Sequence, residues 1–87
     1  MEPRSLCVAA VQMVSAIREV ESNLKRASRL VEEAARGGAT LVLLPELFSA
    51  GYCLCERAWA FAEPEGGRTE AWLCDNASRL GVYVGGC

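Results

Sequence analysis

Two continuous apolar runs constrain the fold of this sequence more than any other feature. Residues 6–11 are Leu-Cys-Val-Ala-Ala-Val, and residues 40–44 are Thr-Leu-Val-Leu-Leu. Neither run alternates with polar residues, which is typical of strands in parallel sheets that are buried on both faces. Pro45 follows the second run and marks its end, because proline has no N–H to donate to a neighbouring strand.

A helical pattern lies between these two runs. In residues 21–36, charged residues occupy one side of the predicted helix, and Glu21–Lys25 and Glu32–Arg36 are spaced for ion pairs four residues apart. The apolar positions at helical spacing are Leu24, Ala27, Val31, Ala34 and Ala35. Two buried strands joined by an amphipathic helix predict a parallel, right-handed βαβ unit.

The second half of the chain extends this unit. Residues 48–67 are predicted to form a loop, with one helical turn over 56–62. Helical spacing returns over 68–80, and residues 82–84, Val-Tyr-Val, predict a third strand. The expected fold class is therefore α/β, with the order β-α-β-α-β in one domain that covers residues 1–87.

Length and charge limit what this domain can be. With 87 residues, 52% of them hydrophobic, the chain is too apolar to be disordered but long enough for only one marginal domain. The net charge of −2 argues against nucleic acid as a partner, and no apolar run is long enough to span a membrane. A small sheet with bare edges and one uncovered face is expected, so the sequence resembles a truncated domain.

The cysteines favour neither a disulfide framework nor a metal site. They are odd in number, and the sequence contains no histidine. The five are Cys7, Cys53, Cys55, Cys74 and Cys87. We expect them to be reduced, mostly buried thiols of a cytoplasmic protein. Because Cys53 and Cys55 are the one close pair, we expect no bound zinc.

Glu46 is the candidate catalytic residue, because it follows a predicted buried strand and reactive groups in open α/β sheets collect beyond the carboxyl ends of strands. Pro45 precedes it, and apolar Leu47 and Phe48 follow it. Desolvation by these neighbours would raise the pKa of its carboxyl group and favour a role as general base. An acid at this place can equally cap the turn or form an ion pair, and its position alone leaves both roles open.

Several motifs, in order along the chain, resemble the amino-terminal portion of the nitrilase or carbon-nitrogen hydrolase family. The most specific is Leu-Pro-Glu-Leu-Phe at residues 44–48, directly after a predicted strand. The others are Ala-Val-Gln-Met at 10–13, Asn23 at the helix entry, Gly-Ala at 38–39, Gly-Tyr at 51–52 and Leu-Gly-Val-Tyr-Val-Gly-Gly at 80–86. Together they cover nearly the whole chain.

The resemblance implies an α-β-β-α sandwich of which this chain is the first part. It also implies hydrolysis of amides, nitriles or carbamoyl compounds by a Glu-Lys-Cys set, without metal or organic cofactor, in a protein that forms homo-oligomers when complete. By resemblance Glu46 is the general base. The family's lysine and cysteine come from later strand ends, and Lys25, the only lysine, is expected to pair with Glu21 in solvent.

Two other functions remain open at this stage. One is a shortened, catalytically inactive chain that acts as an interaction module through its open sheet edges. The other is a cysteine-based redox or metal module, which the spacing of the cysteines disfavours. The aromatic residues near Glu46 could line a substrate pocket but are expected to close the core. These are Phe48, Tyr52, Trp59 and Phe61.

Overall fold

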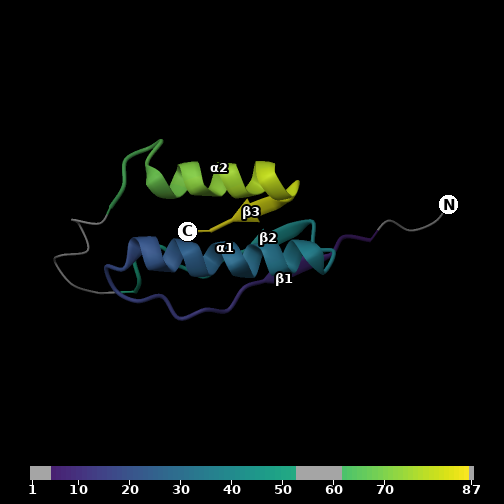
Figure 1. Ribbon diagram of the computed structural model, residues 1–87, viewed down its shortest axis with the longest axis horizontal. Helices are drawn as coiled ribbons and strands as arrows, with labels where there is room; N and C mark the ends of the chain where they lie inside the picture. Colours follow the sequence, from purple (N-terminus) through teal and green to yellow (C-terminus); the bar gives the residue numbers. More distant parts are fainter. Residues whose placement is uncertain (1–4, 53–61, 87) are drawn as a thin grey trace.

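The computed structural model describes residues 5–52 and 62–86 and contains, within them, two helices and three strands in the predicted order. The elements are β1 (Val8–Ala10), α1 (Val20–Arg36), β2 (Leu41–Leu43), α2 (Arg68–Leu80) and β3 (Tyr83–Gly85). Both helices lie on the same side of the strands (Figure 1). β1 and β2 are shorter than predicted, with three residues each, whereas β3 has the predicted three residues but begins one residue later than expected. Most of the helical turn predicted over 56–62 falls outside the described residues.

All strand pairs described are parallel, and β2 lies between β1 and β3. The register places Val42 beside Ala9 on one side and beside Val84 on the other. This confirms the α/β class and the crossover connection inferred from the two apolar runs. Because β2 is the central strand, the residues that follow it lie between the carboxyl ends of β1 and β3.

The helices form where the periodic patterns predict them. The buried face of α1 includes Leu24, Ala27 and Val31, whereas its exposed Lys25 lies 4.0 Å from Glu21, as expected. α2 ends at Leu80 and is capped by Gly81, whose φ of 66° is in the left-handed region that glycine adopts most readily. In the described parts of the chain, neither helix is long and apolar enough to cross a membrane.

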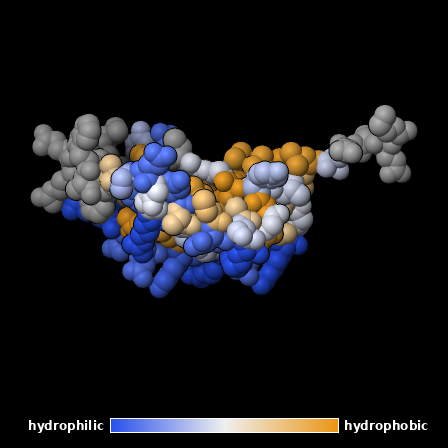
Figure 2. All heavy atoms as spheres, turned by 90° about the horizontal axis from the view of Figure 1, so that it is seen from above, coloured by the Kyte–Doolittle hydropathy of each residue, from blue (hydrophilic) through white to orange (hydrophobic). Residues whose placement is uncertain are grey.

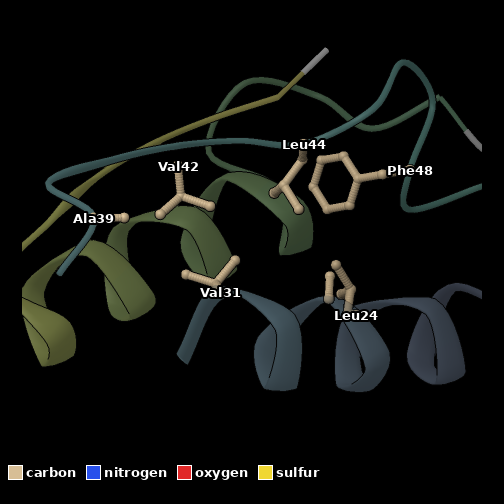
Figure 3. Close-up of a cluster of buried hydrophobic side chains, with 7 residues drawn as sticks. Leu24, Val31, Ala39, Val42, Leu44 and Phe48 are labelled. Carbon is tan, nitrogen blue, oxygen red and sulfur yellow. The ribbon is translucent and has the colours of Figure 1, made fainter. Parts of the chain in front are cut away.

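A compact apolar core lies between the helices and the sheet. Figure 3 shows Leu24 and Val31 of α1 on one side of this core, and Val42 and Leu44 on the other. The phenyl ring of Phe48 lies beside Leu44 and closes the end of the core near the start of α1. The buried apolar residues are Leu24, Ala27, Val31, Ala39, Val42, Leu44 and Phe48.

The opposite face of the sheet is uncovered. Val8, Leu43 and Tyr83, one from each strand, are 48%, 44% and 77% exposed. Figure 2 shows hydrophobic side chains gathered along one side of the molecule and hydrophilic ones along the other. The strands are therefore buried on one face only, as the expected lack of a covering layer implied. An apolar surface of this kind favours association with other protein surfaces.

We expect the 87-residue chain to self-associate when it is produced alone. The driving force is burial of the uncovered apolar face, and within the described residues both outer strands also have unpaired edges. Size-exclusion chromatography across a range of protein concentrations should show species larger than a monomer, or aggregates. A sharp monomer whose strand amides exchange slowly with solvent would contradict this prediction.

A pair of charge variants provides the control. The double substitution Leu43→Lys, Tyr83→Lys places charges on the uncovered face and should shift the chain toward monomer. Glu33→Lys, at an exposed position of α1, changes the net charge of the chain by the same amount as the double substitution. It should leave self-association unchanged. Equal effects of the two changes would attribute association to net charge rather than to the sheet face.

Candidate active site at the carboxyl end of the central strand

The structure places Glu46 just beyond the carboxyl end of β2. The Leu44 N–H donates a hydrogen bond to the Gly85 carbonyl at 2.8 Å, so the chain stays beside β3 up to Pro45. Glu46 then begins a turn over residues 46–50, called here the Glu46 turn. The predicted position is thus found. The predicted enclosure by apolar neighbours is wrong for this chain, because Glu46 is exposed and Phe48 turns away into the core.

Phe48 anchors the Glu46 turn to the core. Its side chain is only 2% exposed, and its ring centroid lies 5.5 Å from that of Trp72 on α2. Gly86 leaves room for this ring, since a Cβ atom at Gly86 would lie 2.6 Å from Cε1 of Phe48. The Trp72 indole N–H in turn donates to Ser28 Oγ of α1 at 2.7 Å. Phe48 therefore ties the turn to the packed pair of helices.

Three successive carbonyl groups of the Glu46 turn accept hydrogen bonds from the segment that precedes α1 or from α1 itself. Ser15 Oγ donates to the Phe48 carbonyl at 2.6 Å. The side-chain amide of Asn23 donates to the Ser49 carbonyl at 2.8 Å. The Arg18 N–H donates to the Ala50 carbonyl at 2.9 Å. The turn is thereby fixed along most of its length.

Asn23 is a structural residue to which sequence reasoning assigned no role beyond the resemblance. It is fully buried in the first turns of α1, on the face that also carries Leu24 and Ala27. A signal was present in the sequence: position 23 lies four residues before Ala27 on the predicted apolar stripe, and a polar group buried there needs hydrogen-bond partners. The identity of those partners, however, depends on tertiary structure.

An open hollow adjoins the carboxyl ends of β1 and β2. It is lined by the four residues that follow β1 and by Pro45, the residue before Glu46. The lining residues are Val11, Gln12, Met13, Val14 and Pro45. Because Gln12 is exposed here, the hollow offers a polar amide beside apolar walls. This position matches the place where ligands bind in open α/β sheets.

The other titratable candidates lie away from the Glu46 turn. Lys25 is on α1 and is paired with Glu21 in solvent. Cys7 precedes β1 and Cys74 is on α2; both are free and exposed, so the expectation of mostly buried thiols is wrong for these two. The remaining cysteines, Cys53, Cys55 and Cys87, lie outside the described residues. In the part of the chain that is described, no three potential ligands are grouped to hold a metal ion.

Two of the four aromatic residues near Glu46 lie in the described part of the chain, and their environments differ. Phe48 is in the core, as predicted. Tyr52 is 59% exposed and does not close the core. Trp59 and Phe61 lie outside the described residues.

Comparison with known proteins identifies the class to which this fold and motif belong. The family model of carbon-nitrogen hydrolases matches residues 7–87. The chain is 43% identical over 81 residues to a protein named "Nitrilase" from Pyrococcus abyssi (strain GE5 / Orsay), an alignment that covers 88% of this chain and 30% of that protein. The chain therefore belongs to the carbon-nitrogen hydrolase family. It spans less than a third of the length of this relative.

Proposed function

We propose that this chain is the amino-terminal part of a carbon-nitrogen hydrolase that acts on non-peptide amide, nitrile or carbamoyl bonds, with Glu46 as its general base. One observation carries the proposal: Glu46 is held, exposed, at the carboxyl end of the central parallel strand, within the Leu-Pro-Glu-Leu-Phe motif. Family membership and the similarity to the Pyrococcus abyssi nitrilase support it.

The proposed mechanism uses the Glu-Lys-Cys set that the family resemblance implies. The Glu46 carboxylate accepts the proton of a cysteine thiol, and the thiolate forms a bond to the carbonyl or nitrile carbon. A lysine ammonium group stabilises the negative charge that develops on the oxygen or nitrogen. With an amide, the nitrogen takes the proton back from Glu46 and leaves as ammonia, which gives a thioester. With a nitrile, the first product is a thioimidate, and one water molecule converts it to the thioester with release of ammonia. A further water molecule then cleaves the thioester to give the acid and restore the thiol. In this proposal the lysine and the cysteine come from sequence beyond residue 87.

The exposure of Glu46 fits such an arrangement. A general base must reach the group from which it takes a proton, to within about 2.6–3.2 Å between heavy atoms. The backbone of the Glu46 turn is held in place while the Glu46 side chain is exposed. The carboxylate can therefore contact catalytic groups from strands and helices that follow in the complete protein. The hollow beside Pro45 is the proposed place for the substrate.

The proposal requires neither metal nor organic cofactor, and it places the protein in the cytoplasm as a homo-oligomer when complete. The cytoplasmic assignment is supported by the uneven cysteine count and by the free state of Cys7 and Cys74. The homo-oligomeric state is an inference from the family resemblance.

The 87-residue chain alone should release no ammonia from a panel of small amides, nitriles and carbamoyl compounds. In this proposal the nucleophilic cysteine is not among residues 1–87, so the covalent step cannot take place. Loss of one member of a catalytic set commonly lowers the rate by several orders of magnitude. A fusion in which the aligned part of this chain replaces the matching part of the Pyrococcus abyssi nitrilase should regain ammonia release.

The unmodified Pyrococcus abyssi nitrilase is the positive control, and heat-treated chain is the blank. Turnover by the chain alone that disappears when Cys53, Cys55 or Cys87 is replaced would show that the nucleophile lies within residues 1–87. A folded fusion without any turnover would contradict the proposed function.

A second function is favoured by the uncovered sheet face. A naturally short chain without catalysis could bind a full-length relative through Val8, Leu43 and Tyr83. Sequencing the transcript beyond the codon for Cys87 distinguishes the two functions. A continuing reading frame with a lysine and a cysteine at later strand ends favours the hydrolase, and a stop codon favours the interaction module.

A further inference from the structure

We propose that Asn23 is a positioning residue that holds the Glu46 turn in the geometry required for proton transfer. This inference rests on the catalytic role proposed for Glu46. The Asn23 side chain has 0% exposure, so it cannot itself meet a substrate on the surface of this chain. Its hydrogen bonds instead join Ala16, before α1, to Ser49 in the turn.

The contacts of Asn23 match the chemistry of a primary amide. Nδ2 donates to the Ala16 carbonyl at 2.7 Å and to the Ser49 carbonyl at 2.8 Å, while Oδ1 accepts from the Ala16 N–H at 2.9 Å. Both amide donors are therefore used. A carboxylate in this place would bring an oxygen against two carbonyl oxygens, and an aliphatic side chain would leave three partly buried backbone groups without these partners.

The backbone of the Glu46 turn needs such external support. Leu47 has a φ of 54°, in the left-handed region that residues other than glycine rarely adopt. Such conformations persist where surrounding contacts enforce them. Glu46 directly precedes Leu47, so relaxation of Leu47 to an ordinary φ would redirect the Glu46 carboxylate relative to the anchored part of the turn.

Close contact at the far end of the turn strengthens this link. Gly51 has a φ of 86°, and a Cβ atom there would lie 2.8 Å from the Cα atom of Ile17. The end of the turn and the segment before α1 are thus pressed together at Gly51, and hydrogen bonds from Ser15 and Arg18 to the turn join them directly. Asn23 bonds to both segments, which makes it the side chain best placed to set their separation.

The functional consequence is a loss of rate rather than of substrate affinity. A displacement of about 1 Å in a reacting group can lower the rate about a hundredfold. Asn23→Ala in the fusion protein should therefore lower kcat by about ten- to a hundredfold. Because Asn23 is buried away from the surface, KM should change less than about threefold, a far smaller effect than that on kcat.

Asn76 offers a matched control. It is also a buried asparagine, at 5% exposure, but its Nδ2 donates to the Trp72 carbonyl within α2 and its Oδ1 accepts from Arg79. Asn76→Ala removes a buried amide without touching the Glu46 turn. It should lower the unfolding temperature by an amount comparable to Asn23→Ala while kcat stays within about twofold, because the hydrogen bonds of the Glu46 turn are unchanged.

A second pair of variants covers the case in which Asn23→Ala does not fold. Ser15→Ala removes only the hydroxyl that donates to the Phe48 carbonyl and should lower kcat about three- to tenfold, which is less than the effect of Asn23→Ala because one hydrogen bond is lost instead of three. Ser15→Thr keeps the hydroxyl and should restore kcat to near the wild-type value. Amide hydrogen exchange at Gly51 should be faster in Ser15→Ala and in Asn23→Ala than in Asn76→Ala.

The outcomes separate this inference from the proposed function. Low kcat in Asn23→Ala and Ser15→Ala, with normal kcat in Asn76→Ala and Ser15→Thr, supports the positioning role. If Glu46→Gln abolishes turnover but Asn23→Ala and Ser15→Ala retain it, the positioning role is wrong and the proposed function stands. If Glu46→Gln retains turnover, both are wrong.

Discussion

Glu46→Gln should lower kcat of the fusion protein by at least about a thousandfold, within the range that general-base catalysis contributes. Glutamine keeps the shape of the side chain and can still accept a hydrogen bond, but it cannot take up a proton from a thiol. Because Glu46 is exposed and is not one of the buried core residues, the unfolding temperature should not change. The measurements are ammonia release at saturating substrate and thermal unfolding of the same preparation.

Two other glutamates test whether loss of any negative charge has this effect. Glu65 is exposed in the turn before α2, and Glu65→Gln should leave kcat unchanged. Glu32 of α1 pairs with Arg36 at 2.7 Å and with Arg79 of α2 at 3.7 Å, so Glu32→Gln should reduce stability slightly, by about 0.5 kcal/mol, without reducing kcat. A Glu46→Gln protein with most of its kcat would refute the general-base role. Loss of activity through unfolding would make Glu46 a structural residue.

The sequence predicted the fold because its strands and helices are marked by local patterns. Continuous apolar runs identified β1 and β2, and helical spacing predicted the bounds of α2 at Arg68 and Leu80, as found in the structure. The lengths of β1 and β2 were overestimated because an apolar run does not show where ladder hydrogen bonds stop. Leu6, for example, belongs to the first apolar run but lies two residues before β1 and is 65% exposed.

The candidate site was predicted in position but not in environment. That Glu46 follows the central strand could be inferred from Pro45 and from the run before it. Its exposure could not, because whether Leu47 and Phe48 enclose a neighbour depends on the direction in which the turn sends each side chain. Phe48 enters the core, whereas Leu47 is 38% exposed.

The hydrogen bonds that fix the Glu46 turn were beyond prediction from local patterns. Asn23 and Ser49 are 26 positions apart in sequence, and Ser15 and Phe48 are 33 apart. The Trp72–Ser28 contact between the helices, 44 positions apart, is of the same kind. Hydropathy and spacing identify which residues are buried, but the polar partners of a buried amide or hydroxyl are set by how distant segments meet.

Phe48→Ala should destabilise the protein by about 3–5 kcal/mol, the usual cost of removing a buried phenyl ring. The ring is 2% exposed and lies against Trp72 and in the space left by Gly86, so its removal opens a cavity between elements that are distant in sequence. Small domains have only about 5–15 kcal/mol of stability in total, and a chain of this length lies at the low end of that range. Most of the fold's stability would then be lost.

Leu47→Ala is the matched control for this experiment, because Leu47 is the adjacent large apolar residue of the same turn but is 38% exposed. Its truncation should cost less than about 1 kcal/mol. The urea midpoints of the two fusion variants, followed by residual activity and by circular dichroism, should differ clearly, with Phe48→Ala much lower. Since unfolding of the larger protein need not be two-state, the midpoints rather than extrapolated free energies are compared. Equal midpoints would show that the Glu46 turn is held by its hydrogen bonds alone, and that the phenyl ring is not its anchor.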